Sequence, residues 1–269
     1  MVKCQVVMDA LETIAPKRLA EDWDNPGLLV GALNQEVNKI LVCLDVSDAV
    51  VEQAIAEGAD MIVAHHPLIF RGIKKLRTDL PLGHRLQQLI KHDIVVAAAH
   101  TNLDIAEGGV NDVLARAIGL SKLSHFVLES QDVDGSVISM GRMGSLPVPM
   151  TVQDFARQVR EALPTDYVRL VDAGARPVRK VAICSGSGAE FIQKAAFMGA
   201  DVYVTGDVKY HEAQQAVEHG MHVIDAGHFG TEFPVVAVLK DRLMEELAEA
   251  KGTVEVIADQ SSKDFFTVV

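Results

Sequence analysis

Short apolar runs alternate with stretches of helical spacing along much of the chain. Runs with the length of buried strands lie at residues 39–46 (KILVCLDV), 59–64 and 94–99. Helical spacing occurs at residues 4–15, 47–56, 84–92 and 109–118. Ser47 is a capping residue at the start of the second of these helices, and Gly58 follows its end. Strands that alternate with helices predict βαβ units and a parallel sheet.

Residues 123–182 follow another pattern. Polar and apolar residues alternate there in several stretches around one helical segment at 151–162. This alternation predicts antiparallel strands added to the sheet. Beyond residue 182 the strand and helix alternation resumes.

The later part of the chain resembles the earlier part. Residues 39–66 align without gaps on 180–207, and residues 84–104 align on 211–232 with one extra residue in the second copy. In this alignment His100 meets His228, and Asp104 meets Glu232. We therefore predict an α/β fold of two similar lobes from an internal duplication, with mixed sheets and helices packed outside. The predicted division is residues 1–122 and 123–269.

Composition narrows the class of protein. The chain has 269 residues, 49% hydrophobic and 23% charged, which is typical of a globular protein. Its net charge of −12 argues against sequence-independent binding of nucleic acid. No apolar run approaches the roughly 18 residues of a membrane span. Cys43 and Cys184 lie in apolar runs and are expected to be buried free thiols, which fits the cytoplasm.

Histidines and acids follow three apolar runs. They are His65 and His66, His100 with Asp104, and His228 with Glu232. The carboxyl ends of strands in an open α/β sheet form the edge where ligands bind. Imidazoles with carboxylates are ligands for zinc, iron or manganese. The pattern predicts a site for two divalent metal ions per subunit.

The spacing also suggests roles. Consecutive residues of an extended chain point to opposite sides, so His65 and His66 suit two different ions. Glu232 is the candidate bridge, Asp104 would complete one ion and His228 the other. Two ions about 3.5–4 Å apart would hold a hydroxide that is nucleophilic at neutral pH. His100 is a third ligand, an orienting residue, or the general acid or base.

Other polar and aromatic positions have simpler interpretations. His84, His92, His125, His211, His219 and His222 are interpreted as structural or surface residues. Ser185-Gly186-Ser187-Gly188 could offer N–H groups to an anion, although a plain tight turn is the preferred interpretation. Trp23, the one tryptophan, is expected to pack in the core.

These segments together resemble a known family. WDNPGLLVG, ADMIVAHHPLIF, AAHTNLD, SGSG, ADVYVTGDVKYH and DAGHFGTE are similar to the signature of the NGG-interacting-factor-three-like family, often labelled GTP cyclohydrolase I type 2 homologs. The resemblance implies a dinuclear-metal α/β protein assembled as a toroidal homohexamer. It implies the ligands His65, His66, Asp104, His228 and Glu232, with His100 close by. The chain departs from the family at Met140, where glycine is usual, and at Phe265, where proline is usual.

Three functions are compatible with this reading. The first is a metal-dependent hydrolase of a small molecule such as a purine nucleotide, with GTP cyclohydrolase-like ring opening and formate release. The second is a phosphoester hydrolase, which would use the same pair of metal ions. The third is a non-catalytic metal-binding or regulatory interaction protein. Three protein ligands per ion leave open coordination positions, which favours catalysis.

Overall fold

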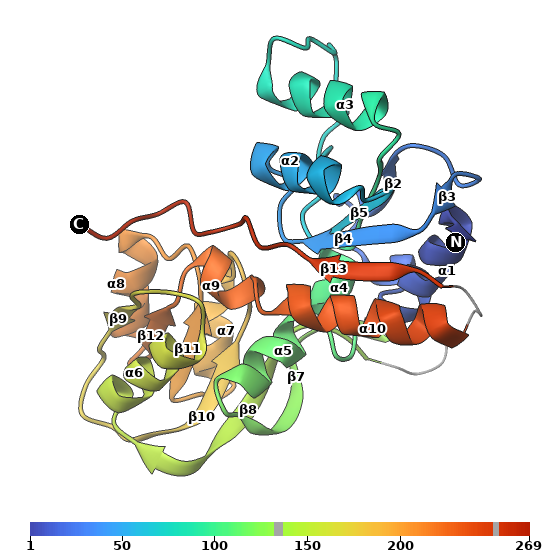
Figure 1. Cartoon of the computed structure of the whole chain (residues 1–269). Helices are drawn as coiled ribbons and strands as arrows, with labels where there is room; N and C mark the ends of the chain where they lie inside the picture. Colours follow the sequence, from blue (N-terminus) through green and yellow to red (C-terminus); the bar gives the residue numbers. More distant parts are fainter. Residues whose placement is uncertain (132–136, 250–252) are drawn as a thin grey trace. The chain divides into compact units, whose positions relative to one another are not determined.

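The chain folds into two compact units. A computed structural model describes residues 1–131, 137–249 and 253–269. The first unit contains Met1–Gly109 with Val236–Lys263, and the second contains Val110–Val235 with Asp264–Val269 (Figure 1). Each unit is therefore built from more than one segment of the chain. The division at residues 122 and 123 stays a prediction.

A mixed sheet forms the centre of the first unit. Its described strands have the order β13-β4-β5-β6-β2. They are β2 (Gly27–Val30), β4 (Lys39–Cys43), β5 (Met61–Ala64), β6 (Val95–Ala98) and β13 (Glu255–Ala258). Strands β13, β4, β5 and β6 are parallel to one another, and β2 is antiparallel to β6. The short strands β1 (Val2–Lys3) and β3 (Glu36–Val37) pair separately.

The described helical segments of the first unit include those predicted at residues 4–15, 47–56 and 84–92, which begin and end close to the predicted positions, and others that were not predicted. They are α1 (Cys4–Ile14), the short η1 (Lys17–Leu19), α2 (Asp48–Glu57), α3 (Pro81–Lys91), α4 (Thr101–Ile105) and α10 (Val235–Glu249). Ser47 Oγ accepts a hydrogen bond from Val50 N at the start of α2, and Gly58 ends that helix with φ of +65°. A left-handed residue after a helix favours glycine, as the sequence predicted.

The second unit also has a mixed sheet. Its described strands have the order β7-β8-β10-β11-β12-β9. They are β7 (Ser121–Gln131), β8 (Val137–Met150), β9 (Arg169–Val171), β10 (Val178–Ile183), β11 (Val202–Thr205) and β12 (His222–Asp225). The helical segments are α5 (Val110–Ala117), α6 (Val152–Ala162), η2 (Ala189–Phe191), α7 (Ile192–Phe197), α8 (Tyr210–Glu218) and α9 (His228–Glu232). The stretches predicted as antiparallel strands within 123–182 contain β8, β9 and β10, where β8 is antiparallel to β10 and β9 is antiparallel to β12.

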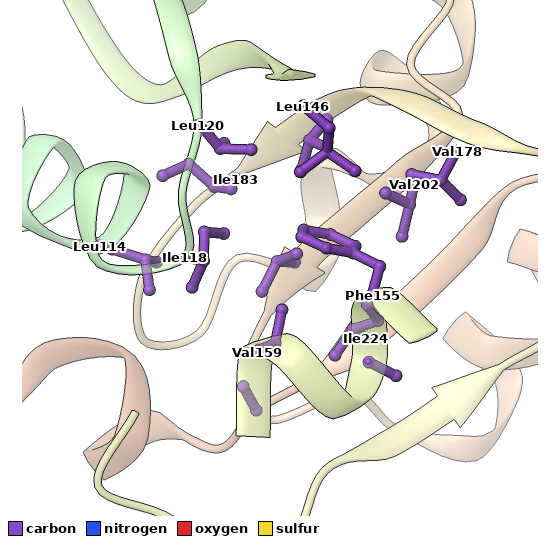
Figure 2. Packing of buried hydrophobic residues seen from close by; sticks show 14 of the residues in the cluster. Leu114, Ile118, Leu120, Leu146, Phe155, Val159, Val178, Ile183, Val202 and Ile224 are labelled. Carbon is purple, nitrogen blue, oxygen red and sulfur yellow. The ribbon is translucent and has the colours of Figure 1, made fainter. Parts of the chain in front are cut away.

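The core of the second unit explains why its central strands are apolar. Alternate residues of β10 and β11 point to opposite faces of the sheet. On one face Ile183 and Val202 pack with Phe155 of α6 and Leu114 of α5 (Figure 2). On the other face Ala182 and Tyr203 pack with residues of α7 and α8, including Ile192 and Ala216. Both faces are thus buried at residues 181–183 of β10 and 202–204 of β11, and these positions are apolar.

The two sheets share a pattern of strands. The parallel trio β4-β5-β6 is flanked by antiparallel β2 beyond β6, and the parallel trio β10-β11-β12 is flanked by antiparallel β9 beyond β12. The fold is therefore a mixed α/β fold, as predicted. A duplication would produce this likeness, and the duplication itself stays a prediction.

Two further expectations concern cysteines and membranes. Cys4, Cys43 and Cys184 are buried thiols that form no disulfide, and burial raises the pKa of the Cys43 thiol. Within residues 1–131, 137–249 and 253–269, no helix has both the length and the apolar character that crossing a membrane requires.

Candidate metal centre

Three histidines of the first unit follow two neighbouring parallel strands. His65 and His66 come directly after β5, and His100 lies two residues after β6. Ala64 pairs with Ala98 in the parallel register, so the two strands end side by side. His65 is fully buried, whereas His66 and His100 are partly exposed. The strand ends therefore bring the three imidazoles to one edge of the sheet.

The three imidazoles form a compact group. One ring nitrogen of each of His65, His66 and His100 lies within 4.8 Å of the others. Their ring centroids are 4.9 Å apart for His65 and His66, 5.3 Å for His65 and His100, and 5.6 Å for His66 and His100. Spacing of this kind suits groups that converge on bound ions.

Each imidazole is oriented through its Nδ1 atom. His65 Nδ1 lies 2.9 Å from the Ala99 carbonyl oxygen, His66 Nδ1 lies 2.8 Å from Asp45 Oδ1, and His100 Nδ1 lies 2.7 Å from Asp24 Oδ1. Carbonyl and carboxylate oxygens only accept hydrogen bonds, so Nδ1 must carry the proton in each ring. In the neutral ring this tautomer places the lone pair on Nε2. Metal-binding histidines are oriented in the same way.

The buried side chain of Asp24 holds the edge of the sheet that carries these histidines. Its Oδ2 accepts hydrogen bonds from the backbone N–H of Thr101, at 3.0 Å, and from Thr101 Oγ1, at 2.6 Å. Burial raises the pKa of Asp24, but hydrogen bonds from His100 and Thr101 outweigh burial and lower the pKa to about 2. Asp24 is therefore an anion at neutral pH and fixes both the His100 ring and the start of α4.

Asp104 brings a carboxylate to the same group. Its Oδ1 lies 3.7 Å from His65 Nε2, and both side chains are buried. Because His65 Nδ1 carries the proton, an Nε2 lone pair faces the carboxylate. A buried imidazole nitrogen and a buried carboxylate in this arrangement would be stabilised by a bound cation. Imidazole nitrogens with a carboxylate are a common donor set for a divalent metal ion, so the residues present fit such an ion.

The second unit carries a histidine and a carboxylate in a similar arrangement. His228 and Glu232 are the first and last residues of α9, which follows β12. His228 Nδ1 lies 2.8 Å from Asp207 Oδ2, and His228 Nε2 lies 3.1 Å from Glu232 Oε2. The buried Glu232 carboxylate thus faces a ring nitrogen of an imidazole whose Nδ1 is held by another acid. This donor pair also fits a divalent cation.

Three N–H groups of the Ser185–Gly188 turn are engaged by side chains of the fold. The N–H groups of Ser185, Gly186 and Gly188 donate to Asn111 Oδ1, Thr231 Oγ1 and Thr205 Oγ1. The turn is therefore tied into the fold, in agreement with the preferred interpretation of its sequence. Gly186 has a further role, because it lies against Glu232.

Sequence reasoning missed the acids that orient the imidazoles. Asp45 and Asp207 each follow a strand of the sheet, and Asp24 lies in the turn before β2. The same strand-end argument that selected His65 applies to Asp45 and Asp207. The histidines interpreted as structural or surface residues lie elsewhere: His84, His92, His211 and His219 are exposed, and the buried His222 accepts a hydrogen bond from Ala173 N.

The expectation for Trp23 was wrong. Its side chain is 60% exposed and lies beside His100, with ring centroids 6.2 Å apart. The flanking hydrogen bonds of Asp24 and Asn25 hold the turn at the strand-end edge, where the indole cannot reach the core.

The sequence as a whole matches one family. Residues 2–264 match the family model described as Duf34/NIF3 (NGG1p interacting factor 3). The chain belongs to the Duf34/NIF3 family. It is 35% identical to a GTP cyclohydrolase 1 type 2 homolog of Clostridium perfringens over 268 residues, which is 100% of both chains. A homolog of the same name from Streptococcus pneumoniae is 35% identical over 97% of both chains.

A solved structure supports the fold of this Duf34/NIF3 member. The Bacillus cereus protein related to NIF3 superposes with a TM-score of 0.95 at 29% identity, covering 100% of this chain and 99% of that one. The family resemblance and the mixed α/β fold predicted from the sequence are therefore confirmed.

Proposed function

We propose that this protein is a metal-dependent hydrolase of a small molecule, holding two divalent metal ions per subunit. The proposed ligands are His65, His66, Asp104, His228 and Glu232, with Glu232 shared by both ions. Zinc, iron and manganese all suit imidazole and carboxylate donors. Bound ions of this kind would supply Lewis-acid polarisation and would lower the pKa of water.

One observation carries the proposal. The rings of His65, His66 and His228 are each held at Nδ1 by an oxygen acceptor, which leaves Nε2 as the basic nitrogen. Two of these Nε2 atoms face a buried carboxylate, at 3.7 Å in the first unit and 3.1 Å in the second. A carboxylate that faces an imidazole nitrogen in this way is a donor pair that suits a divalent cation. The arrangement supports cation binding in both units.

His100 is assigned to proton transfer. Its Nδ1 lies 2.7 Å from Asp24 Oδ1, so Nε2 is the atom that would take a proton from water and return it to the leaving group. A carboxylate in this position fixes the tautomer of a catalytic imidazole and stabilises its protonated form. His100 is partly exposed, which lets a substrate reach it.

The relatives suggest the first reaction to test. They are named GTP cyclohydrolase 1 type 2 homologs, and we carry that chemistry to this chain as a proposal. In it, one water opens the imidazole ring of guanine and a second releases formate. The substrate would be a purine nucleotide.

We also propose an assembly and a location. The family resemblance supports a toroidal homohexamer, and the buried thiols of Cys4, Cys43 and Cys184, which form no disulfide, suit the reducing cytoplasm. Light scattering of the purified protein measures the assembly directly.

Metal content tests the proposal. Protein purified without a metal-affinity tag is expected to hold about two divalent ions per chain, measured by elemental analysis. Formate release from GTP is expected to stop on chelation and to return on reloading. A chain that binds no metal even after reconstitution would overturn the hydrolase and leave a binding role. A metal-loaded chain that releases no formate would exclude GTP as the substrate.

The acids that hold the imidazoles provide a second test. We expect Asp45→Asn and Asp207→Asn each to weaken metal binding roughly 10- to 100-fold, because the amide is a weaker acceptor for Nδ1–H. Competition with a chromogenic chelator measures the affinity. Asp241→Asn is the matched control, because Asp241 pairs with Lys240 on the surface. Wild-type affinity in both variants would contradict their orienting role.

A further inference from the structure

Two exposed aromatic side chains stand beside His100. The ring centroids of Trp23 and Phe70 are 5.8 Å apart with an interplanar angle of 63°. The His100 ring lies 6.2 Å from Trp23 at 77° and 6.1 Å from Phe70 at 84°. Each ring therefore contacts the other two edge to face. We call this cluster of Trp23, Phe70 and His100 the aromatic corner.

The corner is held in place by its neighbours. Asn25 Nδ2 donates to the Ile69 carbonyl oxygen at 2.6 Å, which ties the loop carrying Trp23 to the loop carrying Phe70. Asp24, next to Trp23, is bound to His100 and Thr101. An exposed aromatic pair fixed by hydrogen bonds on both loops has little conformational freedom to lose when a ligand binds.

The position of the corner ties it to the candidate chemistry. The side chains of His66 and His100 are 21% and 17% exposed, so solvent reaches the imidazole group that Trp23 and Phe70 flank. Phe70 is 41% exposed. A molecule lying against Trp23 and Phe70 would therefore have an atom within reach of His100.

We infer that Trp23 and Phe70 form a subsite that binds a planar heteroaromatic ring of the substrate beside His100. This inference rests on the proposed function and adds the place in the same site where the ring of the substrate binds. A flat π-system can stack on one ring of the corner while its edge meets the other. Aliphatic substrates gain neither contact. Stacking of a base on an aromatic side chain is favourable for every base, because each has a π-face.

The loop after Phe70 favours a ligand that carries an anionic group in addition to the planar ring. Arg71, Lys74 and Lys75 follow it, and all three are exposed. The net charge of the chain is −12, so this basic stretch is an exception to the overall balance. A nucleoside phosphate combines the planar ring with the anionic group that such a stretch attracts.

The single tryptophan gives a direct measurement of this subsite. The chain has one tryptophan and three tyrosines, so fluorescence excited at a wavelength that tyrosine does not absorb reports on Trp23 alone. Titration of the metal-loaded protein with GMP is expected to quench this fluorescence to saturation. Ribose 5-phosphate, which has the phosphate but no base, is expected to leave it unchanged. Absence of quenching by GMP, or equal quenching by ribose 5-phosphate, would overturn the inference.

A matched pair of variants tests the ring contact. Phe70→Leu keeps an apolar side chain but removes the ring, and is expected to raise the Kd for GMP roughly 5- to 100-fold. Phe197→Leu makes the same change at an exposed phenylalanine of α7 and is expected to leave the Kd unchanged. Trp23→Ala, followed by equilibrium dialysis with GMP, is expected to weaken binding at least as much as Phe70→Leu. Equal Kd values for wild type and Phe70→Leu would overturn the subsite.

Metal analysis of the same samples separates the two proposals. One outcome is a protein that binds no metal even after reconstitution, while GMP still quenches its Trp23 fluorescence. This outcome would contradict the proposed function and support the subsite. A metal-loaded protein that releases formate, with Phe70→Leu at the wild-type Kd, would support the function and overturn the subsite. If GMP does not bind and Trp23→Ala dissociates the oligomer in light scattering, the aromatic pair is a subunit contact and the inference is wrong.

Discussion

Asp112→Ala is expected to lower the free energy of unfolding by about 3–5 kcal/mol. Asp112 lies on α5, and its Oδ1 accepts a hydrogen bond from Arg142 Nε of β8 at 2.6 Å. Arg142 is 3% exposed, and its Nη1 donates to the carbonyl oxygens of Ser139 and Gly141. Removal of the carboxylate would take away the negative charge that this buried guanidinium contacts at 2.6 Å, in a place that is almost closed to water.

Urea unfolding followed by circular dichroism measures this loss. A double variant, Asp112→Ala with Arg142→Met, removes both charges and is expected to recover much of the stability, because the buried ion is then gone. Asp79→Ala is the control, since Asp79 pairs with Arg77 on the surface, and no measurable change is expected there. An Asp112→Ala variant as stable as Asp79→Ala would show that the buried pair contributes little.

The sequence predicts those parts of the fold that depend on residues close together along the chain. Apolar runs become β4, β5 and β6 because both faces of a central parallel strand are covered. Gly58 marks the end of α2 because its positive φ favours glycine. The histidines then follow the strands, and the meeting of His65 and His100 results from parallel pairing of β5 with β6. The proximity of these imidazoles was therefore predictable from the order of elements alone.

Pairing between distant segments had no such signal. Strand β13 joins the first sheet beside β4, although it comes near the end of the chain. Its residues Glu255–Ala258 are ordinary for a short strand, and nothing in them specifies a partner. Long-range pairing is decided by which edge remains open after the local units form, which the sequence pattern does not encode.

The orienting acids and Trp23 were missed for a related reason. Residue type alone ranks tryptophan as a core residue, because its apolar area is large. In the structure the hydrogen bonds of Asp24 and Asn25 decide its position. Asp24 itself acts on His100 from a turn far away in the sequence, so its role depends on tertiary contacts. Buried hydrogen bonds therefore set the positions of the side chains in the candidate site. The hydrophobic pattern of the sequence reports only which apolar residues are buried.

Gly186→Ala is expected to abolish most metal binding while leaving the fold intact. A Cβ at this position would lie 2.1 Å from Glu232 Oε1 and 3.3 Å from His228 Cε1. The new methyl group would have to displace the Glu232 carboxylate, the proposed shared ligand. Loss of a positioned partner typically costs roughly 10- to 100-fold in metal affinity, and displacement of the ligand itself is expected to reach the upper end. Elemental analysis and chelator competition measure the effect.

Gly220→Ala separates the clash from backbone strain. Gly220 has φ of +63°, close to the +59° of Gly186, but a Cβ there meets nothing within 4 Å. Both variants place alanine in the left-handed region at a cost of about 1–2 kcal/mol. Gly186→Ala is expected to lose more thermal stability than Gly220→Ala, because its methyl group also displaces Glu232. Only Gly186→Ala is expected to lose metal, to the level of Glu232→Ala. Full metal content in Gly186→Ala would contradict the ligand role of Glu232, because a carboxylate pushed from its present position could not hold an ion there.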